Sequence, residues 1–113
     1  MKLELDRQES PIESALVRAC QREGWEVRKQ VWPGHRGAPD RIILADEGVT
    51  VHAETKRPKG GELSPDQAIE HAKLKGKGHA VVTVFNEMDI ARTIALVRKM
   101  VLARRGGCMG SIS

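Results

Sequence analysis

Residues 39–56 limit the fold more than any other part of this 113-residue chain. Two runs rich in apolar and β-branched residues, 41–45 and 49–55, flank a short Asp-Glu-Gly segment. Runs of this kind on either side of a turn sequence are typical of a β-hairpin. Because 42–45 is apolar on both faces of the expected strand, we predict a central strand covered by helices on both sides.

The hairpin would gather three charged residues. An antiparallel pair brings the start of one strand beside the end of the next, which places Asp40 near Glu54. Lys56 follows Glu54 by two residues and therefore shares its face. Two carboxylates beside an ammonium suit a hard divalent cation and a phosphate, a combination that favours phosphodiester hydrolysis. The same charges could also form a solvated cross-strand salt bridge worth about 0–1 kcal/mol.

The motifs around these residues resemble a known nuclease family. Pro39-Asp40 followed by Glu54-Thr55-Lys56 resembles the PD-(D/E)XK nuclease motif. The segment Gly37-Ala38-Pro39-Asp40 and the later Leu63-Ser64-Pro65-Asp66-Gln67 resemble the VRR-NUC (virus-type replication-repair nuclease) family. The resemblance extends over residues 10–84 and implies a restriction-endonuclease-like, three-layer α/β/α core.

The resemblance also implies the site residues. The implied catalytic set is Asp40, Glu54, Lys56 and Gln67. The implied metal is Mg²⁺, with Mn²⁺ as a substitute, held by Asp40, Glu54 and the backbone carbonyl of Thr55. In the family an acidic residue of the first helix often joins the metal site, and Glu13 is the candidate here.

Glu13 and Gln67 each have a local explanation as well. Ser10-Pro11-Ile12-Glu13 has the form of a helix start with a capping box, in which Glu13 would bond back to Ser10. Gln67 stands in the same relation to Ser64. For both residues a capping role and a role in the site stay open from sequence alone, with the site favoured for Gln67.

Two loops beside the expected site are candidates for contact with DNA. Arg36 and Gly37 lie in the loop 32–39, where a guanidinium suits phosphate geometry and a glycine allows close approach of backbone N–H groups. Arg57 and Lys59 lie in the basic loop 57–61. A solvated surface is the alternative explanation for both loops.

The other elements follow from periodicity and helix caps. We predict helices at 10–23, 64–76 and from 86 onward, and strands at 25–31 and 79–85. Ile69 and Ala72 would supply the buried side of the middle helix. The strand–helix–strand succession predicts a right-handed parallel crossover, so the order is α-β-β-β-α-β-α with a mixed central sheet. We expect one domain over 1–103 and a disordered tail over 104–113.

Composition restricts the function classes. The chain has only two Trp, one Phe and no Tyr, which argues against an aromatic platform for single-stranded bases. The net charge of +4 is compatible with a phosphate partner. The two cysteines suggest neither a disulfide framework nor a zinc site. Without a signal peptide or membrane span in the sequence, we expect no membrane partner and a cytoplasmic setting in a bacterial or phage-infected cell.

These features together predict a Mg²⁺-dependent endodeoxyribonuclease. The resemblance implies branched DNA as the substrate, in the manner of a Holliday-junction resolvase. Paired cuts on a four-way junction require two sites related by a two-fold axis, so we expect a homodimer. The alternatives are a non-catalytic DNA-binding module with the same fold, a less structure-selective nuclease, and an unrelated α/β interaction protein.

Overall fold

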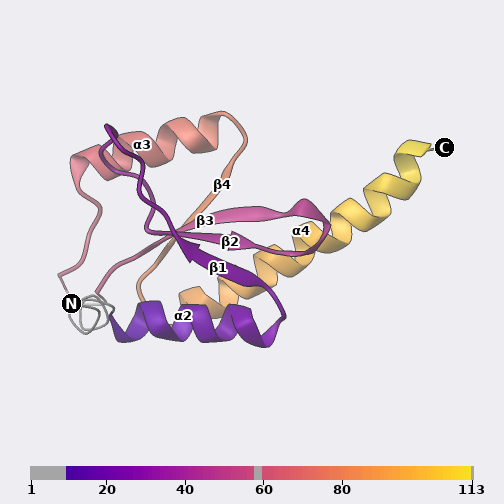
Figure 1. Ribbon diagram of the computed structural model, residues 1–113, viewed down its shortest axis with the longest axis horizontal. Coiled ribbons are helices and arrows are strands. Elements are labelled where there is room, and N and C mark those ends of the chain that lie inside the picture. Colours follow the sequence, from indigo (N-terminus) through magenta and orange to yellow (C-terminus); the bar gives the residue numbers. More distant parts are fainter. Residues whose placement is uncertain (1–9, 58–59, 113) are drawn as a thin grey trace.

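The elements follow one another in the predicted order. The structure is a computed structural model and describes residues 10–57 and 60–112 (Figure 1). Along the chain the elements are α2 (Pro11–Arg22), β1 (Glu26–Lys29), β2 (Arg41–Leu44), the 3₁₀ turn η1 (Asp46–Gly48), β3 (Thr50–Thr55), α3 (Pro65–Gly76), β4 (Ala80–Val84) and α4 (Glu87–Ile112). None of the helices within the described ranges is both long and apolar enough to cross a membrane.

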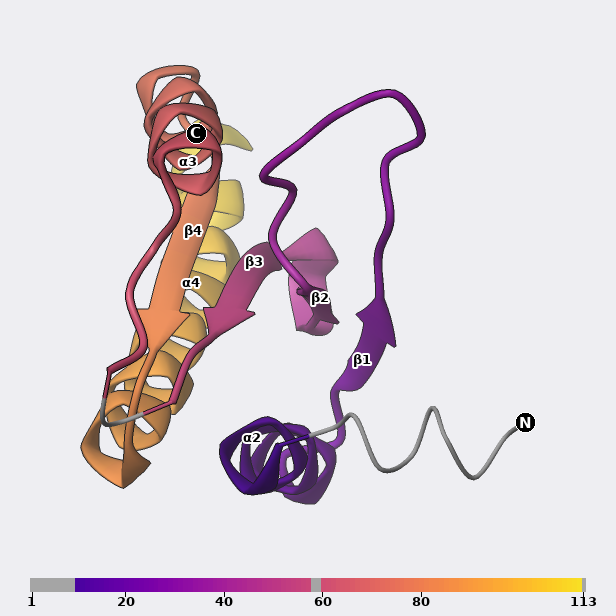
Figure 2. The same ribbon diagram turned by 90° about the vertical axis from the view of Figure 1, so that its left-hand side faces the viewer.

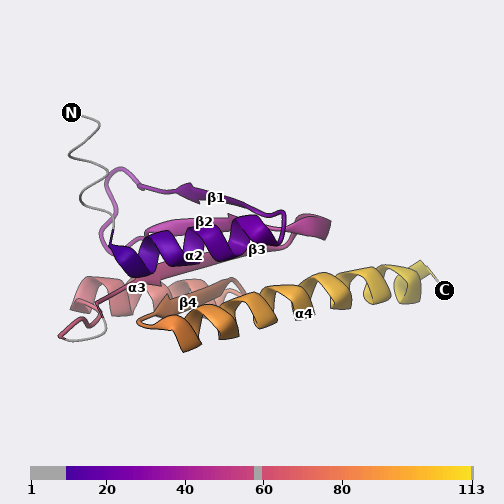
Figure 3. The same cartoon turned by 90° about the horizontal axis from the view of Figure 1, so that it is seen from below.

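The strands form one mixed sheet in the order β1-β2-β3-β4. The β1–β2 and β2–β3 pairs are antiparallel, and β3 and β4 are parallel. Helices α2 and α4 lie on one side of the sheet, whereas α3 lies on the other side beside β4 (Figures 2 and 3). The predicted hairpin, the parallel pair and the three-layer α/β/α architecture are therefore confirmed.

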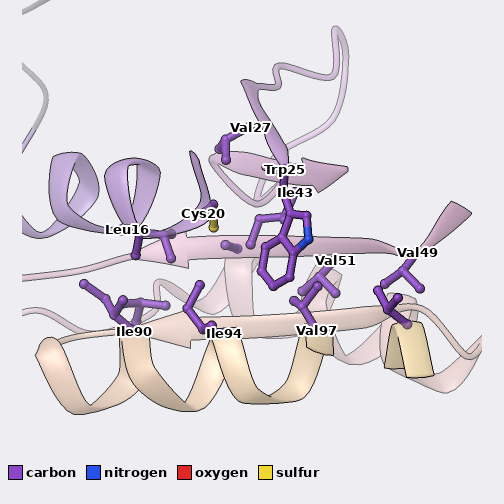
Figure 4. Close-up of a cluster of buried hydrophobic side chains, with 14 residues drawn as sticks. Leu16, Cys20, Trp25, Val27, Ile43, Val49, Val51, Ile90, Ile94 and Val97 are labelled. Carbon is purple, nitrogen blue, oxygen red and sulfur yellow. The ribbon is translucent and has the colours of Figure 1, made fainter. Parts of the chain in front are cut away.

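The hydrophobic core fills the space between the sheet and the pair α2 and α4. Leu16 and Cys20 of α2 face Ile43 and the other inward residues of the strands (Figure 4). Helix α4 contributes the predicted stripe of Ile90, Ile94, Val97 and Val101. Strand residues alternate between the core and the opposite face, so Ile43, Val51 and Ala53 point to the core while Glu54 points to the α3 side.

Two predictions about buried faces are wrong. Ile43 is fully buried, but the neighbouring Leu44 is 40% exposed, because α3 lies over β3 and β4 and leaves that face of β2 without a covering helix. On α3 itself Ile69 is 57% exposed and Ala72 is exposed, and the buried residue is His71. The inner face of α3 contacts polar groups of the sheet, so apolar residues did not identify it.

The end of α4 also differs from the prediction. A disordered tail was expected over 104–113. The described residues 104–112 are helical, and Ser113 lies outside the described residues. Two arginines attach this part of the helix to η1. Arg104 donates to the backbone oxygen of Glu47 at 3.1 Å, and Arg105 pairs with the Glu47 carboxylate at 3.0 Å. These long-range contacts offset the low helix propensity of the glycines that follow.

Candidate active site

The hairpin register places the two acidic residues side by side. Arg41 pairs with Ala53 in the antiparallel ladder, so the preceding residue, Asp40, lies next to Glu54. The Asp40 carboxylate interacts directly with Glu54. Lys56 Nζ lies 3.4 Å from Glu54 Oε2. The structure therefore brings Asp40, Glu54 and Lys56 together on the α3 side of the sheet.

Glu54 is the most deeply buried of these residues, at 1% exposure. Its Oε2 accepts a hydrogen bond from Gln67 Nε2 at 3.0 Å, whereas its Oε1 is buried without a hydrogen-bond partner. Burial, followed by the negative charge of Asp40, raises the pKa of Glu54 to about 7, although Lys56 opposes the shift. Without a cation, a considerable share of the protein at neutral pH therefore has this carboxyl protonated.

Gln67 caps α3 and also contacts the acidic cluster. Its Oε1 accepts from Ser64 N at 2.9 Å while Gln67 N donates to Ser64 Oγ at 3.2 Å, which is a complete capping box. The remaining end of the amide, Nε2, is directed at Glu54. The capping box thus fixes the amide from one side and leaves its NH₂ group to hold the carboxylate.

Glu13 is positioned differently from the capping-box prediction. Ser10 Oγ accepts from Glu13 N at 3.1 Å, but the Glu13 carboxylate binds Arg41 Nε at 2.7 Å. Both side chains of this pair are largely buried, so the pairing satisfies two charges that would otherwise be costly. Arg41 is the residue after Asp40, and Glu13 is therefore connected to the site through β2.

An open cavity of about 670 Å³ lies at this end of the sheet. Its lining includes Asp40, Lys56 and Thr55 together with Glu13. Basic residues at its margin are Lys29 and Arg57. Glu54 lies behind the lining, so a ligand in the cavity would meet Asp40 and Lys56 first.

Three of the four predicted DNA contacts, Arg36, Gly37 and Arg57, lie within the described residues. Arg36 is 88% exposed in its side chain and lies 3.5 Å from Asp66. Gly37 has a φ of +84°, and a Cβ there would lie 2.4 Å from the backbone oxygen of Asp66. This close approach to the first turn of α3 is in itself a reason for glycine. Arg57 is exposed, and Lys59 lies outside the described residues.

The site is suited to a hard divalent cation. Among residues 10–57 and 60–112 no group of three or more His, Cys, Asp or Glu side chains is placed to hold a metal. Two carboxylates lie together, however, one of them with an unpartnered buried oxygen. Mg²⁺ is commonly held by one or two carboxylates and retains several waters. The donor set therefore suits a hard divalent cation. The Glu13 carboxylate, predicted as a possible further ligand, lines the same cavity as Asp40 and is paired with Arg41.

Sequence analysis did not identify His71 as part of this region. The residue is buried at 3% exposure, and its Nε2 lies 3.9 Å from Glu54 Oε1. Burial, followed by the positive charges of Lys75 and Lys56, lowers the pKa of His71 and so favours the neutral ring. Its spacing of one helical turn from Gln67 could have shown that both residues share a face.

Comparisons with known proteins agree with this arrangement. No family model matches the chain. A candidate nuclease, p44, of Acyrthosiphon pisum secondary endosymbiont phage 1 is 36% identical over 89 residues, or 79% of this chain and 94% of that protein. A solved structure described as a VRR_NUC domain has a TM-score of 0.72 at 25% identity, covering 77% of this chain and 94% of its own.

The mixed sheet, its flanking helices and the paired acids define a nuclease domain of the PD-(D/E)XK class. The sequence and structural similarities narrow this class further. The chain belongs to the VRR-NUC family of nucleases, as its motifs predicted.

Proposed function

We propose that the protein is a Mg²⁺-dependent endonuclease that hydrolyses phosphodiester bonds in DNA. The observation that carries the proposal is the buried Glu54 carboxylate, in contact with Asp40 and Lys56 beside an open cavity with basic residues at its margin. A buried carboxyl such as that of Glu54, whose pKa is raised by burial and by a neighbouring acid, is costly for a structural role and is typical of a functional site.

Each residue has a defined task in this proposal. Asp40, Glu54 and the backbone carbonyl of Thr55 hold the cation. When bound, Mg²⁺ or Mn²⁺ supplies Lewis acidity toward the phosphate and makes water more acidic. Lys56 orients the attacking water and neutralises negative charge that develops on the phosphate. Hydrolysis leaves a 5′-phosphate and a 3′-hydroxyl.

Two residues support the acids. Gln67 holds Glu54 through the 3.0 Å bond to Oε2. Glu13 acts indirectly, because its carboxylate is occupied by Arg41 and that pair stabilises the start of β2 next to Asp40. Arg36, Arg57 and Lys59 are proposed contacts for the DNA backbone, and Gly37 shapes the loop that presents Arg36.

We further propose branched DNA as the substrate, with a homodimer as the active form and the bacterial or phage-infected cytoplasm as its location. A domain this small has no separate sequence-reading part within the described residues, which favours recognition of DNA shape. Symmetric cleavage of a four-way junction requires two active sites, and a C₂ dimer supplies them.

The test uses three labelled DNAs: a four-way junction, a splayed arm and a linear duplex, each incubated with Mg²⁺, Mn²⁺ or EDTA. The matched control is Glu54→Gln, which keeps the shape of the side chain and removes its charge. Paired metal-dependent nicks on the junction, absent in the control, are the expected result. Analytical ultracentrifugation of the protein with and without junction DNA shows whether it is a monomer or a dimer.

Other outcomes select the alternatives. Equal cleavage of all three DNAs would indicate a less structure-selective nuclease. Tight binding of DNA without cleavage in any metal would indicate a non-catalytic module. Absence of both DNA and metal binding would leave only an α/β interaction protein.

A further inference from the structure

Three buried polar atoms beneath the active site have no hydrogen-bond partner within the described residues. They are Glu54 Oε1, His71 Nδ1 and His71 Nε2. Buried polar groups in native proteins are nearly always paired, and an unpaired one costs about 1–3 kcal/mol. A leucine would fill the same space without this cost, so filling the core does not explain a histidine here.

The geometry assigns a partner to one of these atoms. His71 Nε2 lies 3.9 Å from Glu54 Oε1, and a shift of about 1 Å would bring the two atoms to a normal hydrogen-bond distance. Gln67 already donates to the other oxygen, Oε2, at 3.0 Å. Because Gln67 and His71 lie one turn apart on the same face of α3, the helix presents one group to each carboxylate oxygen.

We propose that His71 is a positioning residue for the nuclease reaction, with Nε2–H donating to Glu54 Oε1 while Gln67 holds Oε2. The inference rests on the proposed function. Two donors from one helix fix the plane of the carboxylate, and therefore the direction in which Glu54 meets the cation. His71 is almost fully buried and does not line the cavity, so it is not placed to contact DNA. Its proposed partner is the carboxylate of Glu54, and no contact with the cation is assigned to it.

The expected effect of losing this contact is on metal binding first. Groups that hydrogen-bond to a metal-binding carboxylate typically change metal affinity or activity about 10–100-fold when removed. His71→Leu removes both nitrogens and retains an apolar side chain of moderate size. His71→Gln keeps an NH₂ group near the position of Nε2. His79→Leu, at an exposed histidine beyond the other end of α3, is the matched control.

Isothermal titration with Mn²⁺, using the full chain without DNA, is the first measurement. His71→Leu should weaken the affinity about tenfold or more, while His71→Gln and His79→Leu stay within about threefold of the wild type. At saturating Mn²⁺, His71→Leu should lower kcat on DNA and leave KM unchanged. Wild-type affinity in His71→Leu, or an equal loss in His71→Gln, would overturn the inference.

A second measurement needs neither metal nor substrate. Long-range ¹H–¹⁵N spectra of the imidazole in EDTA, at about pH 8.5 where Glu54 is ionised, report which ring nitrogen carries the proton. We expect the Nε2–H form. A ring protonated at Nδ1 alone cannot donate to Glu54 from Nε2, and that result would exclude the proposed contact.

The two proposals fail in distinguishable ways. A wild type that cleaves DNA together with an unaffected His71→Leu rejects the role of His71 and keeps the nuclease. A wild type that binds Mn²⁺ through the His71-dependent site but cleaves no DNA rejects the nuclease, and with it the role of His71 in the reaction, and keeps only the contact between His71 and the metal-binding Glu54. A wild type that binds no Mn²⁺ contradicts both.

Discussion

Replacing Glu54 by glutamine should make the metal-free protein more stable at alkaline pH. Folding raises the pKa of this carboxyl from its ordinary value of 4.5 to about 7. Each pKa unit of this change corresponds to about 1.4 kcal/mol. Ionised Glu54 therefore lowers the free energy of unfolding by about 3 kcal/mol. The neutral amide avoids this cost and keeps an oxygen to accept from Gln67.

The pKa values of Glu54 in the unfolded and folded states set the pH range of this stability difference. Because the folded state holds the proton more tightly than the unfolded chain, the wild type loses stability as pH rises from about 4.5 to 7, and the loss is complete above that range. Below pH 4.5 the carboxyl is protonated in both states and the contribution disappears. The gap between Glu54→Gln and the wild type should therefore be small at low pH and largest at about pH 8.5.

Urea unfolding in EDTA, followed by tryptophan fluorescence, measures the difference in unfolding free energy between Glu54→Gln and the wild type at low pH and at about pH 8.5. Glu26→Gln is the control, since Glu26 is an exposed carboxylate paired with Arg28 at 2.8 Å. Addition of Mn²⁺ should reverse the order. The wild type gains about 1.4 kcal/mol for each tenfold excess of metal over Kd, and Glu54→Gln gains little. An equal or lower stability of Glu54→Gln at alkaline pH would refute the account of the site as a strained acid pair.

Three further changes test separate parts of the structure. Gly37→Ala should destabilise the protein by about 2 kcal/mol or more in urea unfolding, because the glycine combines φ +84° with a 2.4 Å approach to backbone. Gly34→Ala, at φ +78° with open space around it, should lose clearly less, and equal losses would contradict the packing argument. Glu13→Leu should cost about 3 kcal/mol by leaving Arg41 without this partner, and the double change with Arg41→Leu should restore part of it in a double-mutant cycle. Lys56→Ala should abolish DNA cleavage in the nicking assay and spare DNA binding measured by gel shift, and substantial residual turnover would reject its assignment.

Local sequence rules predicted the elements well. The Ser-Pro pairs that begin α2 and α3 and the cap Asn86 of α4 act within one helical turn, and all three caps form. The hairpin was equally local, because a turn between two β-rich runs fixes which residues face each other. The proximity of Asp40 and Glu54 followed from that register alone.

Long-range partners could not be predicted in the same way. The Glu13 carboxylate had a local partner available in Ser10, but it binds Arg41, and that choice depends on how α2 packs across the sheet. The helical conformation after residue 103 was not predicted for the same reason. It is accompanied by contacts of Arg104 and Arg105 with Glu47, which is distant in the sequence. A capping residue or a glycine favours a particular local conformation, but tertiary contacts can override that preference.

The polar face of α3 shows why a functional site is the hardest part of a fold to predict. A helix that served stability alone would turn apolar residues such as Ile69 toward the sheet. Here Ile69 is exposed, while Gln67 and His71 face Glu54 instead. Burying the polar ring of His71 costs free energy, whereas a buried leucine would stabilise the fold. In exchange, Gln67 and His71 place polar groups beside a carboxylate that is itself unfavourable without a cation. The core beneath α2 and α4 compensates for this cost. The hydrophobic core and the candidate active site are therefore on opposite faces of one sheet, and β3 contributes to both, with Val51 and Ala53 in the core and Glu54 in the candidate site.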